Sequence, residues 1–179
     1  CFNRQPEHPV MVFDRDGNHL STWGAGKFRF PHTIRATHDD RLWVVDRDHA
    51  QMYLYTLDGE LLRTLGGRGV RSDTGVKPDD FRSDAWKDVK YGGPPFNLPT
   101  DIDVAPGGEM FVTDGYGHAV WKIAPGKAPE KFVHGAPLDN PVGIARQGDE
   151  LLVVDPRAKS LFRIRADGTL TAVPLAQGK

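Results

Sequence analysis

The chain has 179 residues and a formal net charge of −1, with 23 Lys and Arg residues against 24 Asp and Glu residues. This balance argues against a nucleic-acid partner, because a dedicated nucleic-acid binder needs clustered basic side chains to neutralise phosphates. Apolar residues make up 39% of the chain, and no apolar run approaches the roughly 20 residues of a membrane helix, so we expect a globular protein with no membrane partner. The single cysteine, Cys1, excludes an intrachain disulfide and a thiolate zinc cluster.

Three segments of the chain repeat one pattern. Each begins with a proline, continues through an apolar run that ends in aspartate, and closes on a turn that contains glycine. The proline-to-aspartate spacings are 15, 15 and 14 residues, for the pairs Pro31 and Asp46, Pro99 and Asp114, and Pro141 and Asp155. Independent segments would not keep such a constant spacing, so the pattern indicates a repeat protein.

Each repeat contains four short runs with the alternating or β-branched character of strands. In the repeat from Pro31, the runs lie near 33–37, 42–46, 51–56 and 61–65. Asp39-Asp40 and Asp58-Gly59 fall where tight hairpin turns are needed. Four antiparallel strands in about 42 residues (99 to 141) are typical of one blade of a β-propeller, in which blades stack around a central channel. The sequence therefore predicts an all-β propeller.

Along the chain, the pattern predicts a partial first blade and three further blades in a single domain, 1–179. The first blade, about 1–28, keeps its last two strands around the turn at Asp16-Gly17, and Cys1–Arg4 is expected to be the end of a second strand. The other blades are expected at about 29–66, 97–136 and 139–176. Residues 67–96 are an insertion, polar and broken by glycine and proline; a loop of this length is typical of a functional lid or a flexible excursion.

About three and a half blades leave open strand edges, which propellers normally close. Two explanations stay open: the chain is an incomplete part of a larger propeller, or it closes by self-association through these edges. We favour the first explanation, because the sequence starts inside a blade, without an initiating methionine or a signal-like segment.

The repeats resemble the NHL family, and four stretches resemble the peptidyl-α-hydroxyglycine α-amidating lyases and their bacterial relatives. These stretches are FNRQPEHPVMVFDRDG, FRFPHTI, FNLPTDIDVAPGGEMFVTDGYG and NPVGIA. The third is the most specific, because Pro-Thr-Asp followed by Thr-Asp-Gly-Tyr exceeds what a generic NHL blade requires. The resemblance implies an NHL-type propeller of six blades, of which this chain holds about four. Because bacterial relatives are often exported, it also favours a secreted or periplasmic location.

Carried over by residue, the resemblance implies an active-site arginine at Arg4, a catalytic tyrosine at Tyr116, a zinc-binding histidine at His32 and a calcium-binding backbone carbonyl at Ile34. In the family, zinc and arginines bind the hydroxyglycine end of a peptide at the channel mouth. The tyrosine, as phenolate, removes the hydroxyl proton, and the C–N bond then breaks to give an amide and glyoxylate. An ordinary tyrosine has a pKa near 10, so a neighbouring cation is needed for it to act as a base near neutrality.

The chain departs from the lyase pattern in its last blade. The second zinc histidine is expected after Pro141, where the sequence has Val142, which offers no lone pair. A second active-site arginine is expected directly after Asp155, where the sequence has Pro156, with Arg157 shifted by one position. The third zinc histidine would follow Lys179. A complete tri-histidine zinc site is therefore not predicted, and a weaker site with another ligand stays open.

Most other polar residues are expected to be architectural. The aspartates that recur in each blade, Asp46, Asp114 and Asp155, can accept backbone N–H bonds in the turns that follow them. Asp101 and Asp103 share one face of their strand and are expected to line a watered channel wall or, alternatively, to bind a hard cation. The remaining histidines, His8, His19, His38, His49, His118 and His134, are expected to be solvated. Four aromatic residues are expected in the inter-blade core: Trp43, Phe111, Trp121 and Phe162.

Two functions stay open. The first is a metal-assisted C–N lyase that acts on a small polar or peptide substrate at the channel mouth. The second is a non-catalytic propeller that has lost the zinc site and binds a ligand or a protein through its top face and the 66–97 loop. Pro31-His32 and Asp114-Gly115-Tyr116 favour the lyase, whereas Val142 favours the binding propeller; the fold alone does not decide. RNA binding, known for some NHL proteins, is disfavoured by the charge balance.

Overall fold

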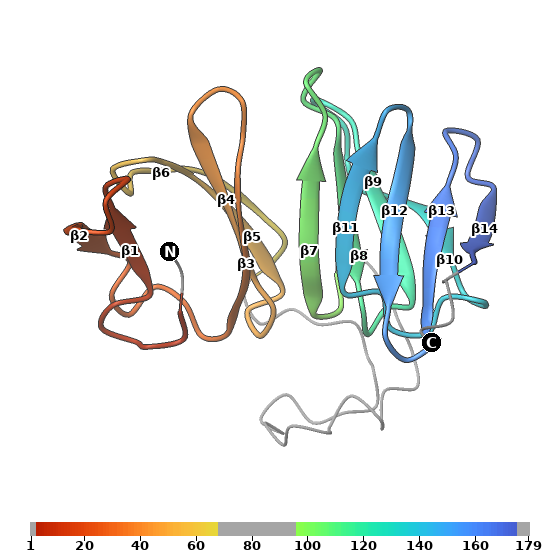
Figure 1. The fold of residues 1–179 in the computed structure, drawn as a ribbon, viewed down its shortest axis with the longest axis horizontal. Coiled ribbons are helices and arrows are strands. Elements are labelled where there is room, and N and C mark those ends of the chain that lie inside the picture. The colour runs from red at the N-terminus through yellow and green to blue at the C-terminus, as the bar shows by residue number, and fades with distance from the viewer. Residues whose placement is uncertain (1–2, 68–95, 175–179) are drawn as a thin grey trace. The chain divides into compact units, whose positions relative to one another are not determined.

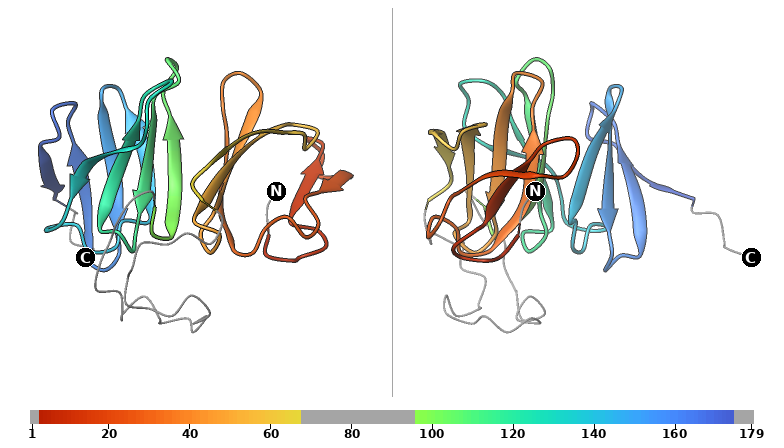
Figure 2. Two further views of the ribbon diagram at one scale, coloured as in Figure 1. Left: turned by 180° about the vertical axis from the view of Figure 1, so that it is seen from behind. Right: turned by 60° about the vertical axis from the view of Figure 1, so that its left-hand side comes forward.

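The computed structural model describes residues 3–67 and 96–174, which form strands and turns without a helix. These residues belong to two compact units, Cys1–Val70 and Arg71–Lys179 (Figures 1 and 2). The described segments contain no helix that is long and apolar enough to cross a membrane. Of the insertion expected at 67–96, only its two end residues lie within the described part of the chain.

The first unit contains a two-stranded and a four-stranded antiparallel sheet. Its strands are β1 (Val10–Phe13), β2 (His19–Trp23), β3 (Pro31–Ala36), β4 (Arg41–Asp46), β5 (Gln51–Thr56) and β6 (Leu61–Leu65). β1 pairs with β2, and the larger sheet has the strand order β3-β4-β5-β6. Each strand thus pairs with its sequence neighbour, as in the predicted blade. The strand expected at 33–37 begins earlier, because Pro31 pairs with Asp46. It also ends earlier, because the Thr37 N–H closes the hairpin turn by bonding to the carbonyl of Arg41, the first residue of β4.

The prediction that Cys1–Arg4 ends a strand is wrong for its described residues, Asn3 and Arg4. The Asn3 side chain accepts the Gln5 N–H at 2.6 Å and donates to the His8 carbonyl at 2.8 Å. Such local bonds from an asparagine side chain favour a turn over an extended strand. The last two strands of the first blade, around Asp16-Gly17, are confirmed.

The second unit contains two four-stranded antiparallel sheets with the strand orders β10-β9-β8-β7 and β11-β12-β13-β14. Their strands are β7 (Pro99–Val104), β8 (Met110–Asp114), β9 (Ala119–Ile123), β10 (Glu130–His134), β11 (Gly143–Gln147), β12 (Glu150–Asp155), β13 (Ser160–Ile164) and β14 (Leu170–Val173). β11 lies beside β7, so the first strands of the two sheets are neighbours (Figure 1).

One aspartate ends the second strand of every four-stranded sheet and accepts backbone N–H bonds from two directions. The donors before the first strand of the sheet are Arg29 (2.7 Å) and Phe30 (3.0 Å) to Asp46, Asn97 (2.7 Å) to Asp114, and Asp139 (2.7 Å) and Asn140 (2.9 Å) to Asp155. The donors in the turn that follows are His49 (3.3 Å), Gly117 (3.2 Å) and Ala158 (2.9 Å). The architectural role expected for these three aspartates is confirmed.

Apolar residues from facing sheets form the core of each unit. In the second unit, the core cluster takes Phe111, Val120 and Leu138 from one side and Ile144, Leu151, Val153, Phe162 and Ile164 from the other. In the first unit, Val44, Tyr53 and Tyr55 pack with the half-buried Trp23, Phe28, Ile34 and Leu42. All four aromatic residues expected in the core are buried.

Candidate active site

His32 lies at a β-bulge at the start of β3. Pro31 pairs with Asp46 and Thr33 pairs with Val45, so the pairing register shifts across His32. The same shift in β7 places Thr100 between Pro99 and Asp101. A bulge turns a side chain out of the regular alternation of the strand, and bulges are frequent beside functional sites. Half-buried His32 is therefore presented by a backbone feature that recurs in the next four-stranded sheet.

Two arginine side chains stack on Phe30, which lies two residues before His32. The Cζ atom of Arg4 lies 3.9 Å from the centroid of the Phe30 ring, and that of Arg47 lies 3.8 Å from it. At this distance one ring face has room for one guanidinium, so the two cations lie on opposite faces. Arg47 is fixed further by its Nε, 2.9 Å from Asp48 Oδ1. In the first unit, Arg4 and Arg47 thus lie close to the start of the strand that carries His32.

Ile34 follows on the same strand, where it pairs with Val44. Its side chain packs on the core cluster of Val44, Tyr53 and Tyr55. This packing fixes the strand, and the expected calcium ligand is the backbone carbonyl of Ile34 rather than its side chain. Calcium binding at Ile34 stays a prediction.

Tyr116 belongs to the second unit and lies in the turn between β8 and β9, half-buried. Its backbone carbonyl accepts a hydrogen bond from the Asn97 side-chain amide, with Nδ2 at 3.1 Å. Asp114 accepts the backbone N–H of Asn97 at 2.7 Å, the Gly117 N–H at 3.2 Å and the Trp121 Nε1 at 3.2 Å. Burial raises the pKa of the Asp114 carboxyl to about 7, although these hydrogen bonds favour its ionised form. The turn that carries Tyr116 is thus held by a fully buried carboxyl group.

Gly115 lies beside Tyr116, and the residues before β11 pack closely against its Cα. A Cβ atom at this position would press on Asn140 Oδ1 and lie 3.1 Å from the Pro141 carbonyl oxygen. Thr100 closes the same junction, since its hydroxyl donates to the Pro141 carbonyl at 3.0 Å. The two sheets of the second unit therefore meet at the turn that bears the predicted catalytic tyrosine.

No family model matches the chain. Two curated relatives are similar in sequence, the peptidyl-glycine alpha-amidating monooxygenases B and A of Xenopus laevis. They are 22% and 24% identical to this chain over 168 residues, and the alignments cover 73% of this chain and 19% and 18% of the relatives. The chain thus spans about a fifth of the length of the curated relatives it matches.

Solved structures resemble the chain in fold. A chain of a nidogen/laminin complex is 14% identical, with a TM-score of 0.66 that covers 94% of this chain and 56% of that chain. Selenomethionine-substituted virginiamycin B lyase from Staphylococcus aureus is 15% identical, with a TM-score of 0.59 that covers 96% of this chain and 57% of that chain. Both are β-propellers. The chain has the fold of part of a β-propeller. In sequence it resembles the amidating enzymes, as FNRQPEHPVMVFDRDG and FNLPTDIDVAPGGEMFVTDGYG predict.

Within the propeller, Asp101 and Asp103 join two neighbouring blades. Asp101 Oδ2 accepts the backbone N–H of Ile144 at 3.0 Å, and Asp103 Oδ2 accepts that of Arg146 at 2.7 Å. Both donors lie on β11, so side-chain carboxylates of β7 hold the first strand of the next blade. Both carboxylates therefore hydrogen-bond to the backbone of the neighbouring blade. The two roles expected for this pair, a watered channel wall and a cation site, stay predictions.

The expectation that the remaining histidines are solvated is wrong for His49. Its side chain is only 10% exposed, and its Nδ1 lies 2.9 Å from Asp46 Oδ2 and 3.2 Å from the Tyr53 hydroxyl. The turn after β4 folds the ring back onto the aspartate three residues earlier. His118 is half-buried, with its Nδ1 against the Asp139 carbonyl. The other four histidines are exposed, as expected: His8, His19, His38 and His134.

The described residues do not complete the zinc site of the lyase family. Within 3–67 and 96–174, no group of three or more His, Cys, Asp or Glu side chains is arranged to hold a metal ion. Val142 stands in the last blade at the position that His32 holds in its own blade. Arg157, one position later than the family arginine, pairs with Asp139 at 3.0 Å.

Sequence reasoning missed Arg47, Asn97 and Asn140. Arg47 directly follows the recurring Asp46, and this Asp-Arg pair is the signal that could have singled it out. Asn97 stands two residues before the proline that opens its blade, and Asn140 stands one residue before its proline. The Asn97 side chain donates to the Tyr116 carbonyl in the turn after β8, whereas Asn140 donates its backbone N–H to Asp155. An asparagine just before each of these prolines was the available signal.

Proposed function

We propose that this propeller is part of a lyase that breaks the C–N bond of a peptidyl-α-hydroxyglycine. The similarity to peptidyl-glycine alpha-amidating monooxygenases supports the class of substrate. The observation that carries the proposal is the stacking of Arg4 on Phe30, beside the strand start that presents His32. A guanidinium, which can bind a carboxylate, and an imidazole thus lie at one end of the first full blade.

Arg4 is proposed to bind the carboxylate of the hydroxyglycine. A guanidinium that stacks on an aromatic ring keeps its N–H groups at the edge available for a carboxylate, and its planar fork can bind both oxygens. Arg47, on the other face of Phe30, is ion-paired with Asp48. The cation of Arg4 favours a substrate that ends in a free carboxylate over its amide or ester.

Tyr116 is proposed to act as the base. Its oxygen takes the proton of the substrate hydroxyl, and the electron pair of that O–H bond forms the aldehyde C=O of glyoxylate. The C–N bond breaks, and its electron pair goes to the nitrogen, which takes a proton and leaves as the peptide amide. The hydrogen bonds of Asp114 and Asn97 to this turn support a fixed position for the tyrosine.

The release of glyoxylate from an α-hydroxyglycine-extended peptide tests the proposal. We expect the chain to release glyoxylate above the rate in buffer. Arg4→Gln should raise KM about tenfold or more, because a charge-assisted bond to the substrate is lost. Tyr116→Phe should lower kcat about a hundredfold, the usual contribution of a general base. Arg15→Gln is the matched control, since Arg15 is an exposed arginine in a turn of the first unit, outside the proposed machinery.

Zinc content of the purified chain separates this function from that of a non-catalytic binding propeller. Stoichiometric zinc that is lost in His32→Ala but kept in His38→Ala, an exposed histidine of the next turn, would support the enzyme. Metal-free protein that is inert towards the hydroxyglycine peptide would contradict it and favour the binding propeller, to which Val142 points.

A further inference from the structure

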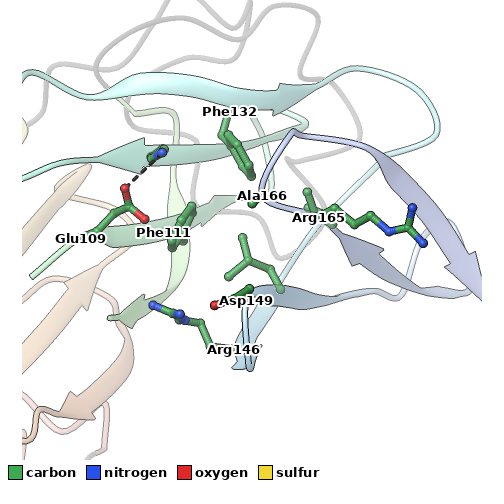
Figure 3. Close-up of a pocket in the computed structure, with 10 residues that line it drawn as sticks. Glu109, Phe111, Phe132, Arg146, Asp149, Arg165 and Ala166 are labelled. Atoms are coloured by element: carbon green, nitrogen blue, oxygen red, sulfur yellow. Dashed lines mark ion pairs between the residues drawn. The ribbon is translucent and has the colours of Figure 1, made fainter. Parts of the chain in front are cut away.

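A pocket of about 240 Å³ opens between the two blades of the second unit (Figure 3). Glu109 enters it from the turn before β8, Asp149 from the turn between β11 and β12, and Ala166 from the turn between β13 and β14. These turns lie at the opposite end of the blades from the turn that carries Tyr116. The pocket is therefore separate from Tyr116, the proposed catalytic residue of the same unit.

The floor of the pocket is apolar and aromatic. Phe111, Leu151 and Ile164 belong to the core cluster that the two blades share, and half-buried Phe132 packs against it. The Phe111 and Phe132 rings lie 5.5 Å apart at an angle of 59°. A dry cavity of about 150 Å³ is large enough for benzene. The pocket therefore has room for an aromatic ring or a branched apolar side chain.

The rim of the pocket carries one cation without a carboxylate partner among the described residues. Lys122 pairs with Glu109 at 3.1 Å, and Arg165 pairs with Glu150 at 3.5 Å. Arg146, by contrast, donates from its guanidinium to the Gly148 carbonyl at 2.9 Å. In Figure 3, Arg146 lies on the side of Phe111 and Glu109, whereas Arg165 extends away from the aromatic rings.

The position of Arg146 is fixed by its backbone. Its N–H donates to Asp103 Oδ2 at 2.7 Å, so β11 is held against β7 whatever the side chain does. Asp149 also lines the pocket, outside ion-pair distance of Arg146. The negative charge of Asp149 repels anions, and it repels a dianion such as phosphate more than a ligand with a single negative charge.

We propose that this pocket binds an apolar carboxylate, with the apolar group between Phe111, Phe132 and Ile164 and the carboxylate on Arg146. The ligand is either a small free acid or the C-terminal residue of a peptide, because both present the same chemistry. A guanidinium at the edge of an apolar pocket binds a carboxylate more strongly than a surface arginine does, because less water competes for it.

Calorimetric titration of the 179-residue chain tests the proposal. The probes are 3-phenylpropionate, its neutral amide, inorganic phosphate, and a short peptide ending in phenylalanine as the free acid and as the amide. We expect each acid to bind about tenfold or more tightly than its amide, and phosphate not to bind. Binding of both acids assigns the pocket to apolar carboxylates in general, and binding of the peptide acid alone assigns it to peptide C-termini; both results support the proposal.

Two variants place the binding at this pocket. Arg146→Gln should weaken acid binding about tenfold, whereas Arg165→Gln, the matched control on the rim, should change it less than about twofold. Ala166→Phe fills the pocket from an exposed turn position and should abolish binding without removing any core contact. Equal binding of acids and amides, unchanged binding in Arg146→Gln, or no saturable binding of either acid would overturn the proposal.

Discussion

Single aspartates tie the turns of this propeller to the chain that precedes each blade. The carboxylate of Asp46, Asp114 or Asp155 joins the chain before a blade to the turn after the second strand of that blade. These N–H groups have no strand partner, and a buried donor left without an acceptor would cost about 1–3 kcal/mol. The aspartate at the end of each apolar run is therefore explained by hydrogen bonding to the backbone, without any catalytic role.

Asp114 should titrate far from the normal range of an aspartate. Its folded pKa of about 7 lies above the ordinary value of 3.8, because burial disfavours the charged form. The folded state therefore keeps a proton that the unfolded state loses near pH 4. The free energy of unfolding should then fall by up to about 1.4 kcal/mol per pH unit, from this group, as pH rises from about 4 to about 7. The carboxyl ¹³C shift of Asp114, followed against pH, measures the midpoint directly.

Asp14 is the internal control for this titration. The side-chain hydrogen bond from Asn18 lowers the pKa of Asp14 below the ordinary 3.8, so its signal should move only in acid. A midpoint for Asp114 near 4 would show that its hydrogen bonds offset the effect of burial on its pKa, and the expected loss of stability towards pH 7 would not occur.

The residue types of the site could be predicted from the sequence, but their surroundings could not. The repeat spacing identified Asp46 and Asp114, and the family motifs singled out His32 and Tyr116. The burial of His49 depends on a turn that folds its ring back onto Asp46, and single-residue patterns do not encode such contacts. The stacking of Arg4 on Phe30 likewise joins residues 26 positions apart (4 to 30).

At the scale of strands, the blade pattern located most elements correctly. The strands at 51–56 and 61–65 agree with β5 and β6 to the residue, although β5 is largely buried and β6 is almost entirely exposed. The start of β3 differs, since the bulge at His32 interrupts the period-2 pattern on which the prediction rested. Bulges are defined by backbone pairing, so the sequence offered only the recurring proline as an indirect sign.

The junction between β7 and β11 depends on side chains and can be tested by removing one of them. Asp103→Ala should leave the Arg146 N–H without its acceptor and lower the free energy of unfolding of the second unit by about 1–3 kcal/mol. Hydrogen exchange at the amide of Arg146 should become faster, and that at Ile144, which Asp101 holds, should change less.

Asp149→Ala is the matched control, because Asp149 is an exposed aspartate in the turn that follows β11. It should leave both the stability and the exchange at Arg146 unchanged. If the Arg146 amide exchanged at the same rate in Asp103→Ala as in Asp149→Ala, this hydrogen bond would not stabilise the junction. The neighbouring blades would then be held together by their apolar core alone.

At the scale of the whole molecule, the repeat count and the fold class were the most secure predictions from the sequence. Both predictions depend on spacings that recur over the entire chain, so an error in the bounds of one strand does not change them. The prediction of one domain over 1–179 stays a prediction, and the insertion at 67–96 lies almost entirely outside the described residues. Patterns within a blade say little about long connections, because polar segments rich in glycine lack a period that would indicate their structure.

The core of the second unit belongs to two blades at once, so a cavity made in one blade should destabilise both. Val153 is fully buried on β12, in a cluster that includes Phe111 and Val120 of the neighbouring blade. Val153→Ala removes two buried carbon atoms and should lower the free energy of unfolding by about 2 kcal/mol. Val154→Ala is a close control: Val154 is the next residue on the same strand and is 48% exposed, so its substitution should cost no more than about 0.5 kcal/mol.

Urea denaturation measures both losses of stability, and hydrogen exchange shows which strands they affect. Val153→Ala should speed exchange in β8 and β9 as well as in β12. Faster exchange confined to β11–β14 would mean that each blade is stable by itself. That result would contradict the argument that blades stack because a single blade depends on its neighbours for stability.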